Sequence, residues 1–260
     1  MGTPYVMRKG VSQLSDLRDG RLAVGTLGIG NIYYVMQTSN ALYDRFISDY
    51  QNEYSDGSLV CHTTIQAGLD AVVSNRNDYV VVMPDSSDYD ITAALTITKS
   101  RFHIIGAGGI VPNGGMPSNS VRIHATSAND IFHITGSNAA TVEIAGFFFK
   151  CAAEKAGVNT GSVTTWHLNI HDNFVGMATS AGAGPGGISG TGAANHASIH
   201  HNYINGYAPA GSKDAAAMIS LGGTSTRSVI TENILVIVMA DNGPFTHFGP
   251  RGMVETLYRG

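Results

Sequence analysis

Charged residues are scarce in this chain, and they do not gather in one place. Only 13% of the 260 residues are Asp, Glu, Lys or Arg, and the formal net charge is −4. Proteins that bind nucleic acid need a basic surface for the phosphates. No stretch of the sequence clusters lysine and arginine. We therefore expect no nucleic acid among the partners.

Cysteine is also scarce. Cys61 and Cys151 are 151 − 61 = 90 residues apart, and neither belongs to a CxxC or Cys/His motif. Isolated cysteines of this kind are typically buried thiols rather than halves of a disulfide or metal ligands. The sequence also lacks the GxxxxGK, GxSxG and HExxH motifs, which mark phosphate-binding, hydrolase and zinc sites. We expect no cofactor.

Long apolar runs are missing as well. No run approaches the roughly 18 residues that a membrane-spanning helix needs, so we expect no membrane partner. Residues 1–20 contain no charged segment followed by an apolar one, which is the pattern of an export signal. We therefore expect that the protein is not exported through a signal peptide.

A short strand-like phrase, in contrast, recurs between Val142 and Leu235. It reads VEIAGF at 142–147, LNIHDNF at 168–174, SIHHNY at 198–203 and VITENI at 229–234. The isoleucines that align are Ile144, Ile170, Ile199 and Ile230, with steps of 170 − 144 = 26, 199 − 170 = 29 and 230 − 199 = 31 residues. Units this short bury their apolar faces only by stacking. The pattern predicts a β-solenoid with the four isoleucines in one interior row.

Three asparagines share one offset from these isoleucines. Asn173, Asn202 and Asn233 each come three residues after the aligned isoleucine, where the strand should turn. Strands stack about 4.8 Å apart, a spacing at which asparagine side chains can hydrogen-bond along a ladder. Asparagine also tolerates the left-handed conformation that such a corner needs. We expect a structural ladder rather than catalytic residues.

The repeat divides the chain into three segments. Residues 1–60 do not join it and are expected to form an N-terminal arm, either as a helix packed on the solenoid end or as an attachment segment. Residues 61–240 carry the solenoid, which begins after a helix within His62–Ser74. Residues 241–260 are expected to form an irregular tail. Within the solenoid, Gly176 to Ala194 consists mainly of small residues and is expected to be an exposed loop.

The first part of the solenoid segment resembles a known fold family. Its phrases are TTIQAGLDA at 63–71, YVVVMP at 79–84, YDITAALTI at 89–97 and HIIGAGG at 103–109. In this order they resemble the N-terminal part of pectate-lyase-like right-handed β-helix proteins, over about 62–240. The resemblance implies an all-β fold: a single-stranded right-handed parallel β-helix with an N-terminal capping helix and an N-terminal extension. It does not imply one function, because this fold carries lyases, hydrolases, epimerases and virion proteins.

A second resemblance concerns function. The phrases NRNDYVVVMP at 75–84, DITAALT at 90–96 and VEIAGFFFK at 142–150 resemble solenoid structural proteins of tailed bacteriophages. This implies a non-enzymatic virion protein that assembles in the host cytoplasm. We expect a homotrimer, because a weakly charged surface rich in small residues buries readily against copies of itself and oligomers favour closed symmetry.

Within that class we favour a capsid decoration, or cement, protein that stabilises the head. Residues 1–60 would then contact the major capsid protein or other virion proteins. The alternative is a tail spike or fibre that binds or hydrolyses a host surface polysaccharide. Its aromatic candidates are Trp166, Tyr203 and Tyr207.

The spike alternative has one candidate catalytic pair. Asp172, His201 and Glu232 share one offset in the repeat, so Asp172 and Glu232 should lie about 9 to 10 Å apart. That is near the upper limit for the two carboxylates of an inverting glycosidase. No other repeat places a third acid at this offset. We therefore favour a row of polar side chains on a solvated strand face, in which His201 neutralises the acids, and assign no catalytic residue.

His171 and His200 occupy the neighbouring offset and are the candidate metal ligands. They should stack directly, and imidazole is a ligand for zinc, nickel or iron. Two histidines are too few ligands unless a symmetry mate contributes more. We therefore expect no bound metal.

Overall fold

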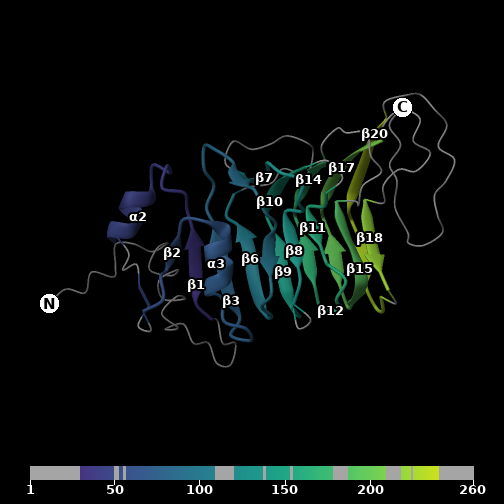
Figure 1. The fold of residues 1–260 in the computed structure, drawn as a ribbon, viewed down its shortest axis with the longest axis horizontal. Coiled ribbons are helices and arrows are strands. Elements are labelled where there is room, and N and C mark those ends of the chain that lie inside the picture. The colour runs from purple at the N-terminus through teal and green to yellow at the C-terminus, as the bar shows by residue number, and fades with distance from the viewer. Residues whose placement is uncertain are drawn as a thin grey trace.

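The computed structural model describes residues 30–49, 53–54, 57–108, 120–136, 139–152, 155–177, 187–208, 218–223 and 225–239. These residues form strands in parallel sheets, together with two short helices (Figure 1). The expectation of an all-β fold built from parallel strands is confirmed. The expected tail at 241–260 lies outside the described residues. Neither helix of the described part has the length and apolar character that crossing a membrane requires.

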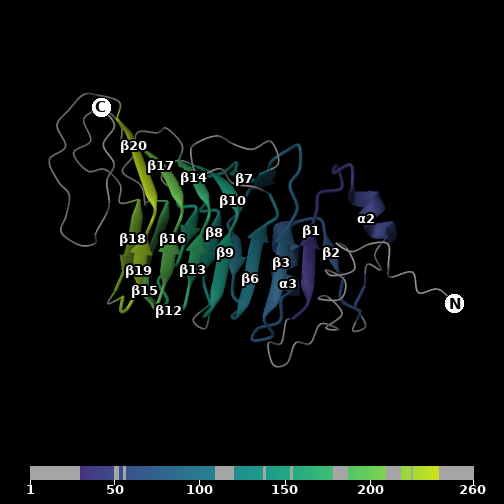
Figure 2. The same cartoon turned by 180° about the vertical axis from the view of Figure 1, so that it is seen from behind.

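Three sheets run side by side along the long axis of the molecule (Figures 1 and 2). The first sheet has the order β19 (Val229–Thr231), β16 (Ser198–His200), β13 (Asn169–His171), β9 (Val142–Ala145), β6 (Phe102–Gly106), β3 (Asp78–Val82), β1 (Ile32–Val35) and β2 (Cys61–His62). The second has the order β20 (Ile234–Met239), β17 (Tyr203–Ala208), β14 (Phe174–Met177), β10 (Phe147–Cys151), β7 (Val121–Ala125) and β4 (Tyr89–Ile91).

The third sheet has the order β12 (Thr165–Trp166), β15 (Ile188–Asn195), β11 (Val158–Asn159), β8 (Phe132–Ile134) and β5 (Leu95–Ile97), and β18 (Ile219–Gly222) also pairs with β15. From β13 onward, successive strands belong to the first, second and third sheets in strict rotation. It passes from the first sheet (β13, β16, β19) to the second (β14, β17, β20) and then to the third (β15, β18).

The register of the first sheet aligns the repeated isoleucines. Ile144 pairs with Ile170, Ile170 with Ile199, and Ile199 with Ile230. The first three are at most 1% exposed, whereas Ile230 is 36% exposed because β19 is the last strand of its sheet. Strand side chains alternate between the two faces of a sheet, so the row lies on the inner face. Phe132, Phe147 and Phe149 pack against one another in the same core, with ring centroids 5.7 to 5.8 Å apart.

The two helices lie at the N-terminal end of the sheets. In α3 (Ile65–Ala71), Thr64 caps the first turn by accepting from the Ala67 amide, and Ile65 and Leu69 join the main core. Helix α2 (Tyr43–Asp49) packs Phe46 against Tyr34 of β1, with ring centroids 4.9 Å apart. Because β1 pairs with both β2 and β3, the first sheet extends into the segment that we assigned to the arm.

The expectation of a loop over Gly176–Ala194 is wrong at both of its ends. Strand β14 continues to Met177, and β15 occupies Ile188–Asn195. The small residues of β15 reflect close packing rather than a loop. A Cβ on Gly190 would lie 1.8 Å from Thr160 Oγ1, and one on Gly192 would lie 2.1 Å from Val163 O. Residues 178–186 between the two strands lie outside the described residues.

The asparagines follow a left-handed corner rather than forming it. The positive φ angles fall on the preceding residues, with 51° at Asp172, 53° at His201 and 54° at Glu232. Asn173 and Asn202 are 1% exposed. The Nδ2 of Asn173 donates to Asn202 Oδ1 at 3.0 Å, and the Nδ2 of Asn202 donates to Asn233 Oδ1 at 2.9 Å. The turn therefore orients Asp172, His201 and Glu232 outward, next to a buried amide ladder, and two of them are the candidate catalytic acids.

Candidate functional site

A file of histidines and carboxylates crosses the outer face of the first sheet. We call it the histidine file, and its members are His103, Glu143, His171, Asp172, His200, His201 and Glu232. His103 and Glu143 each lie between two buried residues of β6 and β9, and His171 and His200 each follow a buried isoleucine of β13 and β16. These four side chains therefore point outward. The other three members occupy the left-handed corners that follow the strands.

Glu143 lies at the centre of the file and contacts two histidines. Its Oε1 is 2.7 Å from His171 Nε2, and its Oε2 is bonded to His103 Nδ1. These hydrogen bonds, first from His103 and then from His171, lower the pKa of Glu143 to about 2 against the opposing effect of burial. The His103 ring is stacked on Tyr79, with centroids 4.2 Å apart, and its Nε2 is 3.1 Å from Asn77 Oδ1. Glu143 is thus an ionised carboxylate that links β6 to β13.

The ring of His171 has a carboxylate at each nitrogen. Its Nδ1 is 2.7 Å from Asp172 Oδ2. The bond to Glu143, with a further contribution from Asp172, raises the pKa of His171 above its usual value. His200 differs, because burial, followed by the nearby His171 and His201, lowers its pKa. The two rings nevertheless stack in parallel, with centroids 4.9 Å apart and an interplanar angle of 3°.

The two candidate catalytic acids are exposed and bonded to different histidines. The side chains of Asp172 and Glu232 are 58% and 66% exposed, and Glu232 Oε2 lies 2.5 Å from His201 Nε2. Glu143 does not share the offset of these acids, because it pairs in register with Asn169, but its side chain reaches His171. Each of the three carboxylates therefore accepts a hydrogen bond from a histidine. Such an arrangement holds strands together and neutralises charge.

His171 and His200, the candidate metal ligands, do not converge on a common point. The lone pairs of an imidazole lie in the plane of its ring, and these two planes are nearly parallel. A metal ion on the lone pair of one ring therefore lies outside the plane of the other. Both rings also use their nitrogens within the file, since His200 Nε2 is 3.2 Å from Asn169 Oδ1 and its Nδ1 is 2.7 Å from His201 Nδ1.

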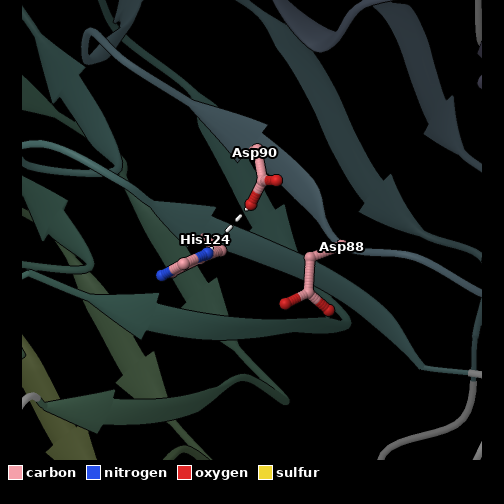
Figure 3. A group of neighbouring side chains, drawn as sticks. All are labelled: Asp88, Asp90 and His124. Carbon is pink, nitrogen blue, oxygen red and sulfur yellow. Dashed lines mark hydrogen bonds and ion pairs between the residues drawn. The ribbon is translucent and has the colours of Figure 1, made fainter.

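The sequence did not single out another group of possible metal ligands, Asp88, Asp90 and His124 (Figure 3). In the part of the chain that the structure describes, their ligand atoms lie within 4.8 Å of one another. Asp90 Oδ1 is bonded to His124 Nδ1 at 2.9 Å. Asp88 is engaged elsewhere, because Arg122 Nε lies 2.6 Å from its Oδ1 and Lys150 Nζ binds its Oδ2.

Two cations thus compete with any metal for Asp88. Burial acts to raise the pKa of Asp88, but the hydrogen bonds from Lys150 and Arg122 outweigh it and lower the pKa. The carboxylate is ionised and already neutralised. We assign this group the role of an ion-pair cluster that joins β7 and β10 to the turn before β4.

The aromatic candidates for a polysaccharide groove lie on different sheets. Trp166 of β12 is 44% exposed and stacks on His196 with centroids 5.9 Å apart. Tyr203 of β17 stacks on Phe174, which stacks on Phe148 in turn, with centroids 4.8 and 4.6 Å apart. The side chain of Tyr207 lies outside the described residues.

Sequence reasoning missed His103 and Glu143, although a signal for them exists. The phrases Phe-His-Ile-Ile at 102–105 and Val-Glu-Ile-Ala at 142–145 have the same order of apolar and polar residues and pair in register. Ile104 is 144 − 104 = 40 residues before Ile144, a longer step than those between the later repeats, so the alignment ended too early. Comparisons of the chain with known protein families, with curated proteins and with solved structures find no match.

Proposed function

We propose that the three sheets are the faces of a single right-handed parallel β-helix, in which each turn of the chain adds one strand to each face. The rotation of β13 to β20 among the sheets supports this winding. So does the in-register pairing of Ile144, Ile170 and Ile199. Crossover connections between parallel strands are right-handed in about 98% of cases, which favours the proposed hand.

On this scaffold the function that we propose is structural and non-enzymatic. The chain would be a virion protein of a tailed bacteriophage, specifically a trimeric decoration protein that cements the head. The observation that carries this proposal is that the carboxylates of the histidine file are already engaged by histidines. Asp172, Glu143 and Glu232 are each bonded to a histidine of the file, which favours rigidity over turnover. The phage assignment rests on the resemblance of the strand phrases.

The proposed partners follow from the same reasoning. The low share of charged residues in the chain, 13%, favours burial of its surface against copies of the chain, and Trp166 is exposed. Residues 1–60 would contact the major capsid protein or another virion protein. The location would be the virion, after assembly in the host cytoplasm.

Copy number in purified phage particles tests this function. Quantitative mass spectrometry with labelled peptide standards would compare the chain with the major capsid protein of the same particles. A cement protein is expected at a copy number comparable to that of the capsid protein. A copy number matching a few trimers would contradict head decoration and favour a spike. The solution mass of the purified chain, expected at three times the monomer mass, tests the trimer separately.

The exposure of two acids and an aromatic side chain favours a second candidate, a polysaccharide-binding or polysaccharide-cleaving spike. Asp172 and Glu232 are accessible at the corners of the first sheet, and an exposed tryptophan such as Trp166 can stack on a sugar ring. A cleaving spike requires that purified protein shortens host surface polysaccharide and that Asp172→Asn and Glu232→Gln abolish the cleavage, whereas a binding spike requires only that the protein retains the polysaccharide. Under the structural proposal, wild type and both variants leave the polysaccharide intact.

A further inference from the structure

His200 differs from the other histidines of the file in what its nitrogens meet. From β13 it faces Asn169, the stacked His171 and, at the following corner, Asp172. From its own corner it faces His201. On the β19 side, Thr231 is its partner in register and Glu232 lies at the corner beyond. His200 is therefore surrounded by two histidines and two carboxylates.

The hydrogen bonds of His200 fit a neutral ring. The Oδ1 of Asn169 only accepts, so His200 Nε2 must donate to it. A His201 ring that donates to Glu232 through Nε2 and to His200 through Nδ1 carries both ring protons. The Nδ1 of His200 is then the acceptor, since two N–H groups cannot hydrogen-bond to each other.

The ring below His200 is, in contrast, bonded as a cation. Both nitrogens of His171 face carboxylates, Glu143 on one side and Asp172 on the other, and an imidazole donates at both nitrogens only in its protonated form. A neutral ring thus lies flat on a charged ring at a centroid distance of 4.9 Å. This arrangement changes as soon as His200 takes up a proton.

We propose that His200 is a pH-sensitive switch, whose protonation loosens the contact of β16 with β13 and β19. A proton on Nδ1 turns the acceptor into a donor, so the His200–His201 bond persists only if His201 gives up its own Nδ1 proton. It also stacks two imidazolium rings face to face. Asp172 and Glu232 offset part of this repulsion, but both are largely exposed and therefore screened by solvent.

The direction of the pH effect follows from the environment. Burial lowers the pKa of His200 below its usual value of 6.5, so folding opposes its protonation. The stabilisation is then complete above pH 6.5 and is lost as the pH falls through the lowered pKa. Acidification should loosen this part of the first sheet before it affects sheets without such a histidine pair.

Hydrogen exchange tests the switch. We expect the amides of β16 and β19 to lose protection severalfold between about pH 7.5 and about pH 5, after correction for the intrinsic rate, while those of β7 and β10 do not. His200→Gln keeps a donor and an acceptor but cannot titrate, so it should remove the loss. The matched control His124→Gln, at a 42% exposed histidine of the second sheet, should retain it. Equal losses in wild type and His200→Gln would overturn the proposal.

Nitrogen NMR of the histidine rings in the unmodified protein gives a second readout, which stands even if the variant does not fold. The proposal requires His200 at neutral pH to carry its proton on Nε2 and to titrate below free imidazole. A proton on Nδ1, or a titration above that of free imidazole, would overturn it.

Discussion

At the scale of single residues, the asparagines show why an amide follows the corner after Ile170, Ile199 and Ile230. The Nδ2 group of Asn202 donates to the carbonyl oxygens of Ile170 and His200 at 2.9 and 3.0 Å, and also lies 2.9 Å from Asn233 Oδ1. Its Oδ1 accepts from the backbone and side chain of Asn173. One short side chain thus satisfies polar groups of two neighbouring turns that would otherwise be buried without partners.

Replacing Asn202 by alanine should therefore be costly. Leaving buried polar groups without partners costs about 1–3 kcal/mol, and Asn202→Ala leaves several. We expect the free energy of unfolding in urea to fall by about 3 kcal/mol. Asn205→Ala, at a partly exposed and outward-facing position of β17, is the control and should change it by less than about 0.5 kcal/mol. Similar effects of the two substitutions would contradict the ladder.

Glu143 gives the histidine file a pH dependence of its own. Because its pKa falls from 4.5 to about 2, the carboxylate stabilises the fold fully above pH 4.5 and loses this effect as the pH falls towards 2. His171 acts in the opposite sense, because its raised pKa gives a stabilisation that is present below pH 6.5 and is lost as the pH rises through that pKa. Their ion pair should contribute most between about pH 4.5 and 6.5.

Urea unfolding of wild type and Glu143→Gln across this range tests the pair. Hydrogen bonds to charged groups contribute about 1.5–3 kcal/mol, and we expect the variant to be less stable by about that amount near pH 5.5. The difference should shrink below pH 4.5, because the unfolded chain then binds a proton at Glu143 whereas the folded chain does so only near pH 2. Glu232→Gln, at a 66% exposed carboxylate, should cost less than about 1 kcal/mol. A difference between wild type and Glu143→Gln that does not change with pH would refute the role of this carboxylate.

At the scale of strands, the sequence predicted register where side chains are distinctive and missed it where they are small. The isoleucines and asparagines of β13, β16 and β19 and the turns after them mark equivalent positions without any structure. Strand β15 escaped prediction because glycine and alanine are normally frequent in loops, and nothing in the sequence shows that Thr160 and Val163 lie against them. The left-handed corners were equally hidden, because they fall on Asp172, His201 and Glu232 rather than on asparagine or glycine.

The isoleucine row offers a test at this scale, because its members differ in burial. Ile199 is fully buried between two strands, whereas Ile230 lies 36% exposed on the last one. Removing a buried isoleucine side chain to alanine costs about 2–5 kcal/mol. We expect Ile199→Ala to lower the unfolding free energy by about 3 kcal/mol and Ile230→Ala by roughly 1 kcal/mol. Equal costs would mean that the two residues share one environment, contrary to the structure.

At the scale of the whole molecule, polar contacts extend the same stacking around the outside. Asp88 before β4 binds Arg122 of β7 and Lys150 of β10, and Glu143 of β9 binds histidines of β6 and β13. These contacts join residues that are far apart in the sequence, which is why periodicity alone found only part of the candidate site. The repeat placed His171, Asp172, His200 and His201 near one another. His103 and Glu143 could be placed beside them only from the strand register, because the step from Ile104 to Ile144 is longer than those between the later repeats.

The in-register stacking of successive repeats is the claim on which the proposed winding depends, and disulfide trapping measures it most directly. Asn169 and Ser198 are partners in adjacent strands on the outer face, where paired Cα atoms lie about 4.8 Å apart, within the range that a disulfide spans. Asn169→Cys with Ser198→Cys should therefore cross-link under mild oxidation. Asn169→Cys with His200→Cys, displaced by two residues to roughly 8 Å, should not. The native Cys61 and Cys151 are buried and can remain. Equal cross-linking of the two pairs, or preference for the displaced one, would contradict the proposed stacking.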